Sequence, residues 1–387
     1  MLVKPALRRS AISSAIAIAM LAPSLSQACT SLLYTDGKGA SYAGRTLELS
    51  MELPYQVAYF PVGTGFGSKA DQHHVLNFHT KNAFVSIGVP DPVNGKFKAI
   101  QGVNDKGLTF SLLAFPNAEG PANAASQTTA VLAAIDLGAW TLSQFDTVAA
   151  VKDALEKQPV LVTALLPKDQ LKTPFHYALH DATGKSIVIE FSNGEQHVYN
   201  NPVGVMTNGP TFPWHMTNLG NYSFLNNIDH SSWEINGRTF QQPDSGIATA
   251  GLPAANTSVG RFIRAVYYSH FAEKVDNPDR ALVTLAHVMN NFDRPRGITI
   301  DKSETKSVAG IPVPDVAGRP GYTSEYTSWT TLTDLNRHQM YVRTYASVNY
   351  TRFDLNQLAQ SKTAKIVELA SIPSDVADAS KILLTAK

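Results

Sequence analysis

The sequence predicts an α+β fold in which a mostly antiparallel core is covered by helices. β-prone runs fill the first part of the chain, helix-like segments gather in the middle, and further β-prone runs follow. Strands and helices therefore do not alternate as they do in βαβ folds. The chain shows no internal repeat and no linker rich in Pro, Gly and Ser between self-sufficient halves, so we expect one domain over residues 29–387.

The first predicted element is a β-hairpin. Thr30 to Thr35 is β-prone, Asp36-Gly37-Lys38-Gly39 is a turn cluster, and Ala40 to Leu47 forms the returning strand. A turn centred on Gly37 or Lys38 places Arg45 or Thr46 opposite Cys29.

The remaining elements follow from residue patterns. Further strands are expected at Tyr55–Phe60, Phe84–Gly88, Leu108–Phe115, His176–His180, Ser186–Phe191, Val203–Thr207, Ser328–Leu332 and Gln339–Tyr345. Helices are expected at Thr129–Leu137, Ser143–Glu156, Val259–Val275 and Arg280–Met289. In the second of these, Val148, Val151 and Leu155 recur at helical spacing behind a Ser143 cap.

Residues 1–28 read as a secretory signal peptide. Lys4, Arg8 and Arg9 are followed by the apolar stretch Ala11–Leu21, which is too short to span a bilayer. Ser26-Gln27-Ala28 then supplies small residues at the cleavage position. We expect an exported protein, periplasmic or secreted, by the Sec or the twin-arginine route, with no transmembrane segment in the mature chain.

Cleavage there would make Cys29, the only cysteine, the first residue of the mature protein. Its thiol is a nucleophile, and its free α-amine, with a pKa near 8, is a suitable base. Two alternatives are a lipoprotein cysteine and a buried inert cysteine. Ser26 and Gln27 do not match the residues that lipidation favours before the cysteine.

Composition limits the choice of partner. A net charge of +1 offers no electrostatic basis for binding nucleic acid or an anionic membrane. A hydrophobic content of 44 % is that of an ordinary globular protein.

Other candidate sites have weaker patterns. His73, His74 and His79 lie in a polar stretch and lack a paired carboxylate or cysteine ligand, and His176 and His180 alternate on one strand as structural residues would. Gly63-Thr64-Gly65-Phe66-Gly67 lacks the Lys and helix of a phosphate loop and reads as a loop. A Cys–His arrangement of Cys29 with His180 or His215 has no supporting residues around Cys29.

Several blocks resemble the choloylglycine hydrolase and penicillin V acylase family of N-terminal nucleophile hydrolases. They occur in the family's order and end near Asp354: Cys29-Thr30-Ser31, Gly44-Arg45-Thr46-Leu47-Glu48, Gly102-Val103-Asn104-Asp105-Lys106-Gly107-Leu108, Asp181-Ala182-Thr183-Gly184-Lys185-Ser186, Gly204-Val205-Met206-Thr207-Asn208-Gly209-Pro210, Gly251-Leu252-Pro253 and Arg261-Phe262-Ile263-Arg264. The resemblance implies a four-layer αββα sandwich that needs no cofactor or metal.

The resemblance also implies the site residues. Cys29 matches the nucleophile, Arg45 the arginine beside the thiolate, Asn208 the asparagine near the α-amine and the oxyanion, and Arg261 a second arginine. Glu48 stands where the family usually has Asp. Taken singly, Arg45, Glu48 and Arg261 could be surface charges, and Asn208 a turn residue.

Ala114 departs from the family pattern, because relatives carry an Asn or Tyr there that helps form the oxyanion hole. Losing one such donor costs about 2.7–4 kcal/mol of transition-state stabilisation where nothing replaces it.

The expected activity is hydrolysis of the linear amide bond of an N-acylated small molecule, with penicillin V or an N-acyl homoserine lactone as substrate. One alternative is a conjugated bile salt hydrolase, and another is an inactive secreted or lipid-anchored ligand-binding protein. A homo-oligomer is left open.

Overall fold

The computed structural model describes residues 28–91, 94–121, 130–163, 174–303, 306–308 and 311–373. The predicted signal peptide, except Ala28, lies outside the described residues, so its structure is not assessed.

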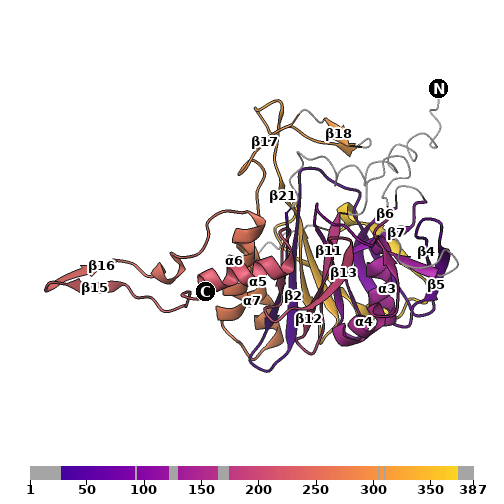
Figure 1. Cartoon of the computed structure of the whole chain (residues 1–387), viewed down its shortest axis with the longest axis horizontal. Helices are drawn as coiled ribbons and strands as arrows, with labels where there is room; N and C mark the ends of the chain where they lie inside the picture. Colours follow the sequence, from indigo (N-terminus) through magenta and orange to yellow (C-terminus); the bar gives the residue numbers. More distant parts are fainter. Residues whose placement is uncertain are drawn as a thin grey trace, which may run out of the picture.

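Two antiparallel sheets stack face to face in the centre of the molecule (Figure 1). The first has six strands in the order β14-β1-β2-β21-β22-β23. Their bounds are Val205–Met206 (β14), Ala28–Thr35 (β1), Ser41–Leu49 (β2), Tyr326–Asp334 (β21), Gln339–Thr344 (β22) and Thr351–Asp354 (β23). Every residue of β2 and β21 is buried, because this sheet is covered on both faces.

The second sheet has eight strands in the order β13-β12-β11-β8-β7-β6-β3-β24. Their bounds are Glu195–Asn200 (β13), Ser186–Ser192 (β12), Phe175–His180 (β11), Thr109–Ala114 (β8), Phe97–Asn104 (β7), Phe84–Pro90 (β6), Gln56–Phe60 (β3) and Lys365–Glu368 (β24). Strand β1 faces β8 across the gap between the sheets.

Helices cover the outer face of each sheet. On the six-stranded sheet, α6 (Ser258–Phe271) packs on β1, and α7 (Pro278–Asn290) packs on β2 and β21. Gly44 permits the close approach of α7, since a Cβ there would lie 2.4 Å from the sulfur of Met289. On the other side, α3 (Leu137–Gln144) and α4 (Val148–Leu155) cover the eight-stranded sheet. The expected αββα order is therefore confirmed.

The register of the first hairpin differs from the prediction. Cys29 pairs with Leu47, and Arg45 pairs with Ser31. The pairing is symmetric about Lys38, one of the two predicted turn centres, and antiparallel pairing about this centre sets Leu47 opposite Cys29, so the predicted partners Arg45 and Thr46 are wrong. The Asp36 carboxylate holds the loop by accepting hydrogen bonds from the backbone N–H groups of Lys38 and Ala40, both at 2.9 Å. Arg45 still lies on the same face of the sheet as Cys29, two residues along.

Two predicted helices have different boundaries. Where a helix was expected over Thr129–Leu137, Ala130–Ala133 forms strand β9 and Ala134–Asp136 a 3₁₀ turn. β9 pairs in parallel with β5 (His74–His79) and β10 (Val160–Leu161), so non-local pairing overrides helix propensity.

The helix expected over Ser143–Glu156 is divided into α3 and α4. Ser143 lies inside α3, and the hydroxyl of Thr147 caps α4 by accepting from the N–H of Ala150. The glycine-rich segment read as a loop also contains a strand, β4 (Gly65–Ser68), which pairs with β5.

The sequence analysis missed the helix α5 (Phe212–Leu219) and a β-hairpin arm. The arm consists of β15 (Ser232–Ile235) and β16 (Arg238–Gln241), which pair only with each other and project from the body (Figure 1). The short remaining elements are β17 (Asp301–Lys302), β18 (Ser307–Val308), β19 (Ile311–Pro312), β20 (Tyr322–Thr323) and α8 (Leu355–Leu358).

Within the described part of the chain, no helix has both the length and the hydropathy needed to cross a membrane. The assignment of residues 29–387 to one domain stays a prediction.

Candidate active site

Cys29 lies in β1 between the two sheets and is 4 % exposed. Its backbone N–H donates a hydrogen bond to Oδ1 of Asn208 over 2.8 Å. Ala28 is still joined to Cys29 here, so this nitrogen is a peptide nitrogen. The atom that would become the α-amine is thus already held by Asn208.

Arg261 reaches the same point from α6. Its guanidinium donates to the carbonyl oxygen of Cys29, to the hydroxyl of Thr30 at 2.9 Å and to Oδ1 of Asn208 at 2.8 Å. Burial lowers the pKa of Arg261, while the negative charge of Glu48 raises it. The predicted residues Cys29, Asn208 and Arg261 therefore form one hydrogen-bonded group.

Asn208 follows β14, and both its side chain and its backbone form hydrogen bonds. Its side-chain Nδ2 donates to the carbonyl of Ala114 over 2.8 Å. Its backbone N–H donates to the hydroxyl of Ser258 at 2.9 Å, and its carbonyl lies 2.9 Å from Nε2 of His215. The amide of Asn208 therefore places a side-chain donor against the backbone of Ala114.

Arg45 connects the two sheets. Its guanidinium donates to the carbonyl of Thr46 on its own strand and to that of Leu112 on β8. It also lies over the ring of Trp329, 5.6 Å from the ring centre. Its charge is buried on the face of the sheet that carries Cys29.

Glu48 pairs with Ala28 across the β1–β2 hairpin. The hydroxyl of Thr327 donates to its Oε1 over 3.3 Å. Burial raises the pKa of the Glu48 carboxyl to about 7, and the positive charge of Arg261 opposes this rise. The exposed fraction is 1 % for Arg45, Glu48 and Arg261, which rules out the surface interpretation of these three residues. Asn208 lies in a bend, as its alternative interpretation has it, but it is only 5 % exposed and its side chain contacts Cys29.

A small cavity of ≈ 20 Å³ opens beside Cys29, with room for about one water molecule. Its lining is mostly apolar and comprises Cys29, Leu47, Glu48, Leu49, Leu53, Tyr55, Ile100, Leu112, Ala114 and Phe175. Burial raises the pKa of Tyr55, so its hydroxyl stays protonated. The lining suits an apolar group attached to a carbonyl next to the sulfur.

His176, which the sequence indicated only as a structural residue, lies beside this group. Its Nε2 lies 3.0 Å from the carbonyl oxygen of Thr207, its Nδ1 lies 3.5 Å from Glu190, and its ring stacks on Phe115 at 4.9 Å. His176 thus contacts the neighbours of both Asn208 and Ala114. A hairpin centred on Thr183 would have placed His176 opposite Glu190, and the observed pairing of Tyr177 with Ile189 has this register.

The rival cysteine–histidine arrangement is not formed. Nε2 of His180 lies 3.1 Å from the hydroxyl of Ser31, and His215 contacts Asn208 and stacks on Phe262. Burial lowers the pKa of each imidazole to about 4. Neither ring hydrogen-bonds to Cys29 within the described chain. No group of three or more potential metal ligands occurs among the described residues.

Comparison with known proteins identifies the family. The model of the linear amide C–N hydrolases of the choloylglycine hydrolase family matches residues 29–310. The bile salt hydrolase/transferase of Clostridium perfringens is 26% identical over 337 residues, which are 85% of this chain and 93% of that protein. The penicillin V acylase of Pectobacterium atrosepticum is 26% identical over 349 residues, which are 87% of this chain and 84% of that protein.

A solved structure shares the fold. A mutant of the conjugated bile acid hydrolase from Clostridium perfringens matches with a TM-score of 0.72 and 23% identity, over 88% of this chain and 96% of that chain. The sequence blocks, the layered fold and the family match agree. The chain therefore belongs to the choloylglycine hydrolase family and is a hydrolase of linear amide C–N bonds.

Proposed function

We propose that this protein is a cysteine N-terminal nucleophile amidohydrolase that acts on N-acylated small molecules, either penicillin V or N-acyl homoserine lactones. The observation that carries the proposal is the hydrogen-bonded group of Cys29, Asn208 and Arg261. It holds the nitrogen and the carbonyl of the nucleophilic residue before any substrate binds.

The reaction has two stages. The α-amine of mature Cys29 takes the thiol proton, and the thiolate attacks the acyl carbonyl. The side-chain amide of Asn208 and backbone N–H groups stabilise the oxyanion, and the proton passes to the departing amine. Water then attacks the thioester, which releases the carboxylic acid and restores the thiol. Arg45 and Arg261 keep the site electropositive, and Glu48 orients the α-amine.

The choice of substrate rests on the lining near Cys29. Leu53, Ile100 and Ala114 offer apolar contacts to the carbon atoms next to the acyl carbonyl. These contacts suit phenoxyacetyl and aliphatic acyl groups, whose remaining atoms lie outside this cavity of ≈ 20 Å³. A conjugated bile salt is the alternative, because the relatives include both named bile salt hydrolases and a named penicillin V acylase.

A hydrolysis screen of the mature protein tests the function. We expect turnover of penicillin V or of an N-acyl homoserine lactone, and a loss of kcat of at least about a thousandfold in Cys29→Ala, because the variant has no nucleophile. Amine release is the measurement for all three substrate classes. Preferred turnover of conjugated bile salts would overturn the substrate choice, and turnover by Cys29→Ala would overturn the nucleophile.

We further propose export with cleavage after Ala28. Ala28 and Cys29 are each 4 % exposed and paired with β2, so a peptidase reaches their bond only before the hairpin forms. Cleavage therefore precedes folding.

The N-terminus of the active protein is accordingly expected to be Cys29. A form that keeps Met before Cys29 should fold with the same circular dichroism spectrum but show no turnover, since its nitrogen is then an amide without basic character. Intact-mass analysis and assay of both forms provide the measurement. Full activity of the extended form would contradict a role for the α-amine, and a diacylglyceryl adduct would indicate a lipoprotein.

Glu48 should give the uncleaved chain a distinct pH dependence. Its pKa rises from 4.5 to about 7 on burial, so the folded chain binds this proton more tightly than the unfolded chain. The free energy of unfolding should therefore fall as pH rises through this range, by up to about 3 kcal/mol relative to Glu48→Gln.

Urea unfolding of both proteins between pH 4.5 and pH 7 measures this difference in chains that keep Ala28. In the mature chain the α-ammonium group favours the carboxylate, and the difference should shrink. A difference independent of pH in the uncleaved chain would show that Glu48 stays ionised.

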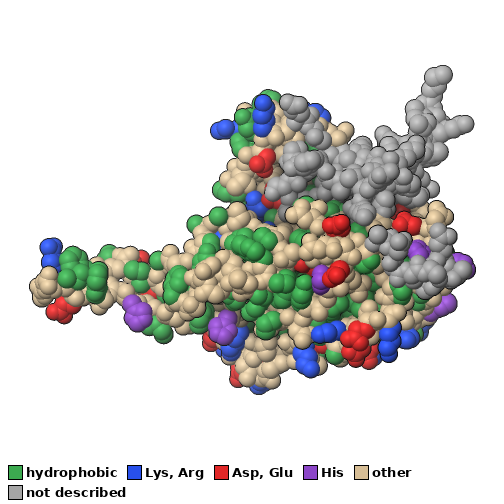
Figure 2. All heavy atoms as spheres, viewed as in Figure 1, with side chains coloured by type: hydrophobic (Ala, Val, Ile, Leu, Met, Phe, Trp, Pro, Cys, Tyr) green, Lys and Arg blue, Asp and Glu red, His purple; other side chains and the backbone are tan. Residues whose placement is uncertain are grey.

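The projecting arm supports a homo-oligomer. Trp233 and Phe240 are 69 % and 48 % exposed, and Figure 2 shows hydrophobic side chains along the arm. An isolated two-stranded hairpin is marginally stable in water, and exposed aromatic clusters commonly mark contact surfaces. We propose that a second copy of the chain covers the arm.

Replacing both Trp233→Ser and Phe240→Ser should convert the oligomer to a monomer in sedimentation velocity, because the contact loses its aromatic side chains. Val348→Ser is the matched control, since Val348 is 71 % exposed and lies outside the arm. The same sedimentation coefficient for wild type and the double variant would exclude the arm as the contact.

A further inference from the structure

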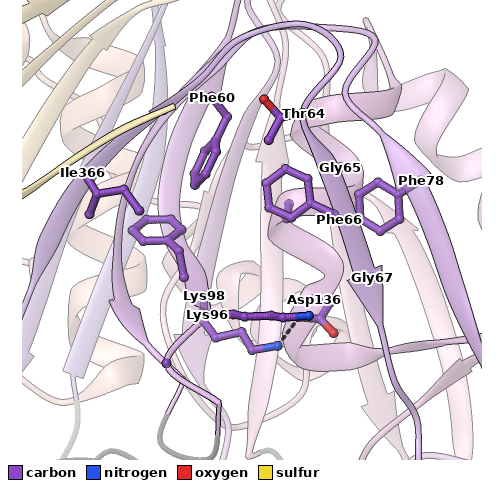
Figure 3. A pocket seen from close by; sticks show the side chains of 13 residues that line it. Phe60, Thr64, Gly65, Phe66, Gly67, Phe78, Lys96, Lys98, Asp136 and Ile366 are labelled. Carbon is purple, nitrogen blue, oxygen red and sulfur yellow. Dashed lines mark hydrogen bonds and ion pairs between the residues drawn. The ribbon is translucent and has the colours of Figure 1, made fainter. Parts of the chain in front are cut away.

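A second pocket lies where the β4–β5 hairpin meets the ends of β3 and β7 (Figure 3). Its volume is ≈ 290 Å³, close to the lower limit for small-molecule sites. None of its lining residues lines the cavity at Cys29. The lining comprises Phe60, Thr64, Gly65, Phe66, Gly67, Phe78, Gly95, Lys96, Phe97, Lys98, Asp136, Ala139 and Ile366.

One side of the pocket is aromatic. The rings of Phe66 and Phe78 stack with centres 5.6 Å apart, and Phe60 meets Phe66 at 5.1 Å and Phe97 at 5.5 Å. Figure 3 shows these rings on one side and the lysines on the other. Rings held in this way offer preformed faces and edges to an apolar or aromatic body, at little cost in conformational entropy.

The other side has a surplus of hydrogen-bond donors. Lys98 forms an ion pair with Oδ1 of Asp136, and Oδ2 of Asp136 accepts from the hydroxyl of Ser68 at 2.7 Å. Lys98 also lies 3.4 Å from Asp91. Both oxygens of Asp136 are therefore engaged, so a cationic ligand finds no free carboxylate there.

Lys96 is the lysine of the pocket lining that takes no part in this cluster, in which Lys98 lies between two carboxylates. Its side chain is exposed at the pocket, and its ammonium group has no ion-pair partner among the described residues. An ammonium group has three donors and no acceptor, so it favours a ligand with an anionic acceptor. A carboxylate next to an apolar body matches both sides of the pocket.

We propose that this pocket binds an apolar monocarboxylate, with its aromatic or aliphatic body against Phe60, Phe66 and Phe78 and its carboxylate at Lys96. This is the chemical class of acid that hydrolysis of an N-acyl amide releases, and this link to the reaction rests on the proposed function. The pocket is then a second site for the acyl product, separate from Cys29.

Calorimetric titration of the mature protein tests the pocket. Alkylation of Cys29 with iodoacetamide closes the first site, and phenoxyacetate and decanoate are the probes. We expect one carboxylate bound per chain. Lys96→Gln should weaken binding about two- to fivefold, the range for an exposed ion pair, and Lys96→Glu should weaken it about tenfold. Phe66→Ala should weaken both probes about tenfold through the lost ring contact.

Controls separate this site from general binding. Lys38→Gln changes an exposed lysine in the β1–β2 loop and should leave affinity unchanged. Phenoxyacetamide, which has no charge, should bind more weakly to the wild type and should not respond to Lys96→Gln. Absence of binding to the alkylated protein overturns the proposal. Unchanged carboxylate affinity in both Lys96 variants overturns it as well, because Lys96 lies on the surface and its replacement should not prevent folding.

The two proposals fail in different ways. If the pocket binds carboxylates but the protein hydrolyses no amide, the proposed binding site stands and only its link to the reaction product is lost. Hydrolysis without binding to the alkylated protein would retain the proposed function and remove the pocket.

Discussion

The structure depends on the hydrogen bonds that meet at the side chain of Asn208. Its Oδ1 accepts from both Cys29 and Arg261, and its Nδ2 donates to Ala114, so one side chain joins β1, α6 and β8. A buried guanidinium is costly unless its donors are satisfied. Because Arg261 finds acceptors in Cys29, Thr30 and Asn208, the position that satisfies this buried charge also fixes Cys29, the proposed nucleophile.

A second set of contacts keeps Asn208 itself in place. Ser258, His215 and His176 hold the backbone from Thr207 to Asn208, and the ring of His176 also packs on Phe115, next to Ala114. The two segments that would surround an oxyanion are therefore fixed by a common neighbour. Rigid placement of donors is what makes such a site effective, because no reorganisation is then required during the reaction.

The central strands, the helices α6 and α7 and the layered architecture could be predicted from the sequence, because local patterns and the family blocks specify them. The exact register of the first hairpin could not, because the turn cluster allows a centre at Gly37 or at Lys38. The observed centre is Lys38, where the Asp36 carboxylate accepts from two backbone N–H groups, and this centre sets Leu47 opposite Cys29. A strand whose residues are all buried, such as β2, also has no alternation of polar and apolar residues from which to read the register.

The grouping of Cys29, Asn208 and Arg261 could be predicted because the family blocks name these residues, whereas contacts that come from another strand could not. Burial of Arg45 and Glu48 depends on coverage by β21, α7 and the second sheet, which no local pattern shows. For His176, the partner Glu190 could have been predicted from the sequence. The turn around Thr183 sets Tyr177 opposite Ile189, and one further step sets His176 opposite Glu190. Buried polar groups are expected to form hydrogen bonds, and His176, which faces the buried Glu190, also contacts the carbonyl of Thr207. Pairing the predicted strands before judging single residues would therefore have linked His176 to Glu190, but not to Thr207, which belongs to the other sheet's side of the site.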